Sequence, residues 1–187
     1  MNEPYFDGPS HWAWIKENFK HESPEGGFYL TFEDIIKRAL QMYAHKEWYA
    51  YLYGTDGQTC NDALVDTMVK KYPGHFISRD IEAIKEYSRG KVVFDCSGFI
   101  HSIFNAPDRS AKGIIDSCDA IYYNIAECPE GSVLYKPGHI GLDIGRGCFI
   151  DIAGECDTFR LKVSREYDWA KAGLWGSYCD YTGATND

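Results

Sequence analysis

A switch from strand to helix around Cys96 constrains the fold of this chain more than any other feature. Residues 91–94 (Lys-Val-Val-Phe) are an apolar, β-branched run typical of a buried strand. Directly after them, the apolar residues of segment 99–104 repeat with the spacing of one buried helical face. The pattern predicts a strand that leads into a helix with Cys96 in its first turn. Because amide hydrogens and the helix dipole favour a thiolate there, we expect a lowered pKa and a nucleophilic role for Cys96.

A second motif supplies a candidate base. In residues 138–145 (Gly-His-Ile-Gly-Leu-Asp-Ile-Gly), apolar side chains alternate with polar or small ones, which predicts a half-buried strand. His139 therefore points away from the apolar face. Residues 148–152 predict the returning arm of a hairpin, and Asp151 is the polar residue on that arm.

The hairpin connection leaves two registers open. With a two-residue turn at 146–147, Asp151 pairs with Leu142 and faces the core, because strand faces alternate. A direct pairing of His139 with Asp151 needs a wider, bulged connection, which the glycines around Arg146 allow. We predict that Asp151 faces His139, where a carboxylate would hold the imidazole tautomer.

These motifs together resemble the NlpC-type papain-like cysteine peptidases of bacterial cell walls. The resemblance rests on the Asp-Cys-Ser-Gly-Phe segment 95–99, the Gly-His-Ile-Gly segment 138–141 and a polar residue twelve positions after the histidine, within roughly residues 45 to 155. It implies that Cys96 attacks an amide carbonyl, that His139 is its base, and that Asp151 orients the histidine. It also implies a papain-like fold.

The resemblance implies three substrate-binding residues as well. Tyr53 matches a Tyr-Gly pair that lines the site near the oxyanion, although it could equally be a core tyrosine whose hydroxyl is bonded nearby. Asp95 and Ser97 would contact the free amine end of a stem peptide. The alternative is that these two residues simply cap the helix that begins at Cys96.

The remaining patterns predict a single α+β domain over residues 1–187, with N-terminal helices packed on a small antiparallel sheet. Thr31 and Asp34 form a capping box for a helix through about His45. Strands are predicted at 131–135, 138–145, 148–153 and 158–163. The chain departs from short family members by an N-terminal extension (1–30) and a helical insert (about 59–90), and it resembles the long forms found in phage and Gram-positive lysins. The tryptophans at 12, 14, 169 and 175 are expected to pack between the two chain ends.

Composition excludes several classes of function. Lys and Arg number 19 against 28 Asp and Glu, a formal net charge of −9, which argues against nucleic acid as a partner. The seven cysteines are odd in number and lack C-x-x-C spacing, so we expect free thiols and neither a metal nor a cofactor. No segment approaches the ~20 apolar residues of a membrane span. Met1 is not followed by an export signal, so we expect synthesis in the cytoplasm without a signal peptide.

The resemblance implies a peptidoglycan hydrolase. The predicted reaction is endopeptidase cleavage of the stem peptide at the γ-D-glutamyl to diamino-acid bond, through a thioester. Three alternatives stay open: an N-acetylmuramoyl-L-alanine amidase, a papain-like acyltransferase or toxin, and a binding module without activity. A dry acyl tunnel would favour the transferase, and an open polar groove the wall peptide. Delivery to the cell wall would then require a phage holin, a virion or a secretion apparatus.

Overall fold

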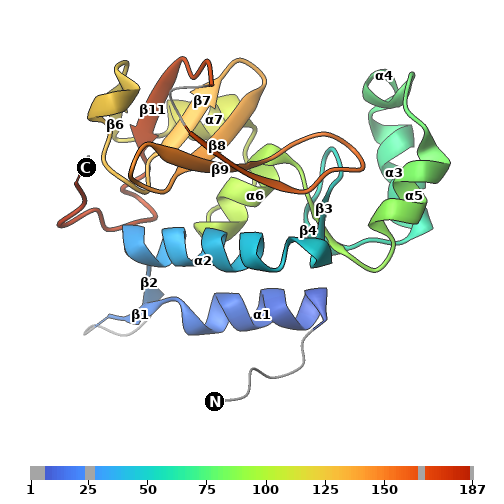
Figure 1. The fold of residues 1–187 in the computed structure, drawn as a ribbon, viewed down its shortest axis with the longest axis horizontal. Helices are drawn as coiled ribbons and strands as arrows, with labels where there is room; N and C mark the ends of the chain where they lie inside the picture. The colour runs from blue at the N-terminus through green and yellow to red at the C-terminus, as the bar shows by residue number, and fades with distance from the viewer. Residues whose placement is uncertain (1–6, 24–27, 164–166, 186–187) are drawn as a thin grey trace.

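The protein folds as an α+β structure, as the sequence predicts (Figure 1). The structure is a computed structural model and describes residues 7–23, 28–163 and 167–185. Segments 1–6 and 24–27 of the expected N-terminal extension lie outside the described residues. Two long helices lie beneath a six-stranded sheet, and a group of shorter helices stands to one side. Within the described segments, no helix has the length and apolar character needed to cross a membrane.

The larger sheet carries the hairpin with His139. Its strands are β6 (Ala120–Tyr122), β7 (Val133–Lys136), β8 (His139–Asp143), β9 (Cys148–Ile152), β10 (Phe159–Val163) and β11 (Lys171–Leu174). They lie in the order β10-β9-β8-β7-β11-β6, with antiparallel pairs throughout. The four strands predicted between 131 and 163 are therefore confirmed, with adjusted bounds. β6 and β11 are not predicted, because segments this short are too brief to show the alternation of apolar and polar residues that identifies a strand.

A second, smaller sheet leads into the helix that begins at Cys96. It consists of β3 (Tyr49–Tyr51), β5 (Val92–Phe94) and β4 (Asp56–Thr59) in the order β3-β5-β4. β3 and β5 run parallel, whereas β4 is antiparallel to β5. This mixed sheet departs from the purely antiparallel prediction. A parallel pair needs a long crossover, and the segment from β4 through the helical insert supplies it.

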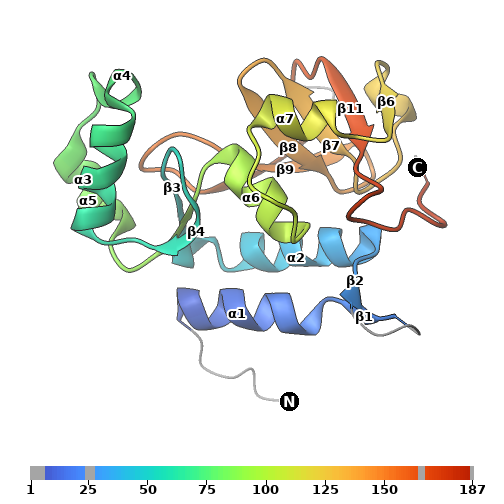
Figure 2. The same ribbon diagram turned by 180° about the vertical axis from the view of Figure 1, so that it is seen from behind.

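The helices beneath the sheet bury one continuous core. α2 (Phe32–Ala44) has the predicted capping box between Thr31 and Asp34. α6 (Cys96–Ile103) lies between α2 and the strands β8 and β9, while α1 (Gly8–Asn18) lies on the far side of α2, against β5 (Figure 2). Only α2 of the two N-terminal helices therefore packs on the larger sheet. The shorter elements are β1 (His21–Glu22), β2 (Phe28–Tyr29), α7 (Ala111–Asp116) and the 3₁₀ turns Lys46–Trp48 and Ile125–Glu127.

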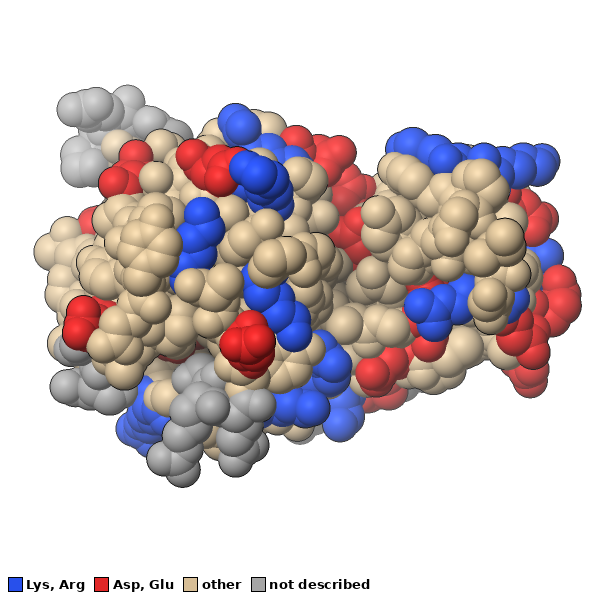
Figure 3. Space-filling model, turned by 90° about the horizontal axis from the view of Figure 1, so that it is seen from above, with Lys and Arg blue, Asp and Glu red and all other residues tan. Residues whose placement is uncertain are grey.

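The helical insert forms a lobe with its own small core. It contains α3 (Asp62–Lys71), α4 (Pro73–Phe76) and α5 (Ile81–Ser88). Pro73 starts a helical turn rather than only ending the previous helix, since proline suits the first turn of a helix. The lobe core consists of Ala50, Leu52, Cys60, Val65, Met68, Phe76, Ile84 and Val93. Seen from above, the molecule narrows between this lobe and the main body (Figure 3).

The loop between β9 and β10, residues 153–158, ties the lobe to the main body. In Figure 1 this loop extends across β3 toward the insert. The carboxylate of Glu155, only 3% exposed, lies 2.5 Å from His75 Nε2 and 3.4 Å from Arg79 Nε. The amide of Tyr51 also donates to the carbonyl of Asp157 at 3.0 Å. One buried carboxylate therefore links the insert to the sheet that carries the candidate base.

Candidate active site

Cys96 is the first residue of α6, as the sequence predicts. Its side chain is buried, at 9% exposure. Backbone amides of Ile140, Ser97 and Cys96 itself form hydrogen bonds with the sulfur. Because Ile140 directly follows His139 in β8, the sulfur lies beside the strand that carries the candidate base.

The expectation of a lowered pKa for Cys96 is wrong for the free protein. Burial, reinforced by the charge of Asp95, raises the pKa of Cys96 to about 12, and the amide hydrogen bonds only partly oppose this rise. A helix end contributes about 0.3–1 kcal/mol when exposed. Since each pKa unit corresponds to about 1.4 kcal/mol, the cost of burying a thiolate outweighs that contribution. Cys96 therefore rests as a thiol and needs a base to become a nucleophile.

His139 and Asp151 face each other, as predicted, in a register that differs from both alternatives considered. β8 and β9 pair Leu142 with Ile150, and the connection at 145–147 has positive φ at each residue. Asp151 thus lies across from Gly141, on the same strand face as His139. The Oδ2 atom of Asp151 is 2.6 Å from His139 Nε2. A side chain at Gly141 would crowd the Cβ of Asp151 at 3.2 Å, so this glycine gives the diagonal contact its space.

The charge of Asp151 determines which nitrogen of His139 can act as a base. Burial alone would raise the pKa of Asp151, but hydrogen bonds from His139 and Arg160, together with the charge of Arg160, hold it below its usual value. An ionised carboxylate only accepts hydrogen bonds, so Nε2 of His139 carries the hydrogen. Nδ1 is left with a free lone pair, which can take a proton from the thiol.

Two further residues, which the motifs do not single out, complete the surroundings of the base. Arg160, paired with Asp151 across β9 and β10, donates from Nε to Oδ1 at 2.8 Å and from Nη2 to Oδ2. Trp169 stacks on His139, with ring centroids 5.7 Å apart and planes 12° from parallel. The expectation that Trp169 packs between the chain ends is therefore wrong. The alternation of 158–163 places Arg160 on one strand face, yet nothing in that pattern reveals the carboxylate opposite.

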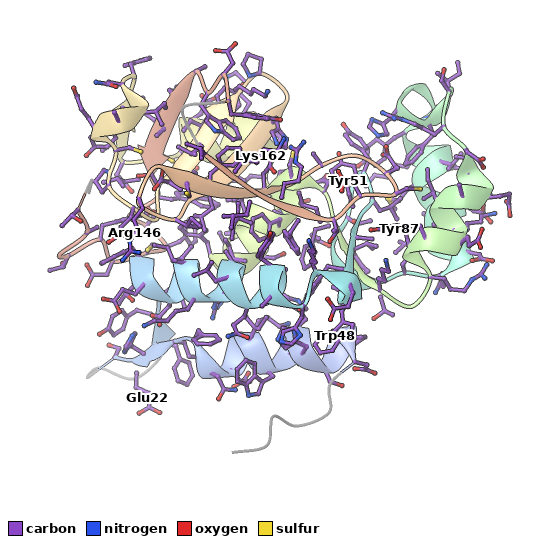
Figure 4. The ribbon with its side chains drawn as sticks, viewed as in Figure 1. Glu22, Trp48, Tyr51, Tyr87, Arg146 and Lys162 are labelled. Atoms are coloured by element: carbon purple, nitrogen blue, oxygen red, sulfur yellow. The ribbon has the colours of Figure 1, made fainter. Side chains whose placement is uncertain are left out.

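Two tyrosines lie on the other side of the nucleophile. Tyr53 is half-buried and stacks on His75 of the insert, with centroids 4.0 Å apart. Tyr51 is buried on β3, and burial followed by the charges of Cys96 and Asp95 raises its pKa. Figure 4 shows Tyr51 at the junction between the main body and the insert. Tyr51 is thus a second tyrosine beside Cys96, and the Tyr-Leu-Tyr alternation of 51–53 is the signal that could have found it.

Asp95 and Ser97 are part of the cap of α6. Oδ1 of Asp95 accepts from the Gly98 amide at 2.7 Å and from the Ser97 hydroxyl at 2.9 Å, and Oδ2 accepts from the Gly54 amide at 2.9 Å. The capping interpretation is confirmed. Contact between these residues and a substrate amine stays a prediction.

A polar pocket of about 430 Å³ opens beside the start of α6. It lies between the insert and the loop that follows α6, and charged side chains of both signs line it, among them Asp95, Lys71 and Arg109. Tyr53 and Ser97 also line it, so all three predicted substrate-binding residues border the same space. The pocket borders the residues on either side of Cys96 in the sequence, whereas Cys96 and His139 are not among its lining residues.

The described residues hold no group of three or more His, Cys, Asp and Glu side chains arranged to bind a metal ion. The seven cysteines are all free thiols. The site brings together a thiol, an imidazole and a carboxylate, which α6, β8 and β9 carry.

Comparison with known proteins finds similarity in fold. No protein-family model matches the sequence, and no curated protein matches it. The structure of the peptidoglycan hydrolase RipB from Mycobacterium tuberculosis is similar, with a TM-score of 0.49 and 15% sequence identity over 77% of this chain and 66% of that one.

Two structures from Trichomonas vaginalis, of NlpC2 and NlpC1, are similar to the same degree. Both have TM-scores of 0.48 and identities of 14%, and they cover 75% and 83% of this chain. The matched parts are 46% and 54% of their own chains, so this chain spans about half of their length.

Proposed function

We propose that this protein is a cysteine amidohydrolase that cleaves the stem peptide of peptidoglycan, at the γ-D-glutamyl to diamino-acid bond. The observation that carries the proposal is the arrangement of Cys96, His139 and Asp151. The buried thiol of Cys96, at the start of α6, lies beside strand β8, which carries His139. Nε2 of His139 is hydrogen-bonded to the buried carboxylate of Asp151. This is the arrangement that nucleophilic catalysis by a thiol requires.

The reaction follows from the resting protonation states. Because Cys96 rests as a thiol, its proton passes to His139 Nδ1 as the sulfur attacks the amide carbonyl. The imidazolium that forms is stabilised by Asp151 and then protonates the leaving amine. The amides at the start of α6 stabilise the oxyanion, and Tyr53 lines the site beside them. His139 then activates a water molecule, which releases the product from the thioester.

The polar pocket supports hydrolysis of a peptide over transfer of an acyl chain. Charged side chains such as Lys71 and Arg109 line the space beside α6. A fatty acyl chain gains nothing from such a lining, since burying charged groups against apolar chains is costly. Charged groups of a stem peptide suit it well.

The test is mass spectrometry of purified muropeptides after incubation with the wild-type protein and with Cys96→Ala. We expect the wild type to separate D-glutamate from the diamino acid, and Cys96→Ala to lose at least about a thousandfold of this activity. Cys156→Ala, which removes an exposed thiol, is the matched control and should cleave like the wild type. Release of whole stem peptides from the sugar would establish the amidase instead. A folded wild type without any cleavage would contradict the proposal.

A further inference from the structure

The carboxylate of Asp151 is buried away from solvent. Its side chain is 0% exposed. An isolated carboxylate at such a position would take up a proton, because burial disfavours its charged form. The hydrogen bond from His139 opposes this effect, and the hydrogen bonds and charge of Arg160 oppose it further. The ionisation of Asp151 therefore depends on both neighbours.

Arg160 supplies a cation with a fixed geometry. It stands directly across from Asp151 in the pairing of β9 with β10. Its Nε and Nη2 atoms donate to the two different carboxylate oxygens. Such a two-point contact fixes the plane of a carboxylate as well as its charge, which a lysine cannot do. Oδ2 then accepts from both Arg160 and His139.

The guanidinium of Arg160 is itself held in place. Its Nη2 atom donates to the hydroxyl of Tyr167 at 3.2 Å and lies 3.5 Å from His139 Nε2. Lys136 of β7 approaches the Tyr167 ring, with Nζ 3.9 Å from the ring centroid. The charged or titratable neighbours of Asp151 in the described residues are thus His139 on β8, Arg160 on β10, and more distantly Tyr167 and Lys136.

We propose that Arg160 is a positioning residue, which keeps Asp151 ionised and fixes its carboxylate plane so that His139 presents Nδ1 to Cys96. The inference rests on the proposed function for its catalytic meaning. Its physical content concerns Asp151 alone: without the guanidinium, burial raises the pKa of the carboxyl, so a larger fraction of Asp151 carries a proton at a given pH. A protonated Asp151 can donate to His139 Nε2, and the hydrogen then moves to Nδ1, where it blocks the base.

The experiment is a pH titration of the Asp151 carboxyl by ¹³C NMR in the wild type, Arg160→Met and Arg160→Lys. In Arg160→Met we expect Asp151 to take up its proton at a pH at least about one unit higher than in the wild type. Arg160→Lys should keep the wild-type titration while lowering kcat about tenfold with little change in KM, because only the two-point geometry is lost. Lys162→Met, an exposed charge two residues along the same strand, is the matched control and should leave both quantities unchanged.

Alkylation of Cys96 by iodoacetamide, followed by peptide mass spectrometry over the same pH range, adds a readout that needs no wall substrate. Wild-type protein that fails to cut muropeptides but shows the expected titrations would contradict the proposed function and leave the role of Arg160 intact. A folded Arg160→Met whose Asp151 titrates as in the wild type would overturn the role of Arg160. Should Arg160→Met not fold, an unchanged kcat in Arg160→Lys would overturn it as well.

Discussion

The two sides of the candidate site are held by different kinds of contact. On the nucleophile side, main-chain groups hold the residue before Cys96: the amides of Gly54 and Gly98 donate to the Asp95 carboxylate, and the Asp95 amide donates to the carbonyl of Thr55 at 2.9 Å. On the base side, side chains from separate strands and one loop position the imidazole. The difference shows that the nucleophile depends on how closely the main chain packs, whereas the base depends on buried charge.

The backbone contacts on the nucleophile side leave no spare room, and Gly98→Ala is expected to have the largest effect. A Cβ atom at residue 98 would lie 2.0 Å from the carbonyl oxygen of Thr55 and 3.0 Å from the Cα of Asp56. α6 would have to move away from the β3–β4 loop, at a cost of about 3 kcal/mol in the free energy of unfolding. Urea denaturation measures this change, and cleavage activity should fall with it.

Gly74→Ala is the matched control for that substitution. Gly74 lies in α4, and a Cβ there meets nothing within 4 Å. Replacing a helical glycine at an open position should stabilise by at most about 1 kcal/mol. If Gly98→Ala unfolded at the same urea concentration as the wild type, backbone packing would not be what holds the nucleophile.

The link between the insert and the sheet gives a smaller, local effect. Glu155→Gln removes the buried charge that faces His75 and Arg79. We expect a loss of about 2 kcal/mol, because a hydrogen-bonded charge becomes a neutral amide between partly exposed partners. Hydrogen exchange should quicken in α3 to α5 and stay unchanged in the larger sheet.

Glu82→Gln on α5 is the control for this link, since the carboxylate of Glu82 is 84% exposed and pairs with Lys85. It should change exchange nowhere. Faster hydrogen exchange in β8 and β9 of Glu155→Gln would show that loosening the insert also loosens the larger sheet, so the two sides of the site would not be held independently.

The base side tolerates a small intrusion better, so Gly141→Ala should have the smallest effect. A Cβ at residue 141 would lie 3.1 Å from the Trp169 ring and 3.2 Å from the Cβ of Asp151. Side chains can move by a few tenths of an ångström where a backbone carbonyl cannot. We expect a loss of about 1 kcal/mol in stability and about tenfold in kcat as the ring over His139 shifts.

A double-mutant cycle tests the cause of that loss. Trp169→Phe removes the part of the ring that Gly141→Ala would crowd, so the double variant should lose less than the sum of the two single losses. Strict additivity of the two substitutions would show that the Trp169 ring is not what Gly141 accommodates.

The contrast between the two sides also explains what the sequence could predict. The start of α6 at Cys96, the capping role of Asp95 and the capping box at Thr31 all follow from local patterns, because each depends on residues three or four positions apart. The hairpin that carries His139 and Asp151 is local as well. Its register is harder, since positive φ at Arg146 is unusual for a residue with a side chain.

The rest of the site depends on pairings that are distant along the chain. Arg160 meets Asp151 only because β10 returns in one particular register, and Trp169 reaches His139 from a segment that no strand pattern places. The prediction of a lowered pKa for Cys96 is wrong for a related reason. A local sequence pattern predicts the helix and therefore its dipole. The burial of Cys96, which outweighs the dipole, depends on the packing of the whole core.

The position of β11 in the larger sheet has a consequence for the timing of synthesis. β11 lies between β7 and β6, two strands made well before it, and Trp169 lies two residues before its start. A growing chain folds from its N-terminal parts first. The ribosome therefore releases the thiol and the imidazole long before the strand and ring that complete their surroundings. A nascent chain of this protein is expected to carry Cys96 and His139 without their complete surroundings until residue 174 has been made.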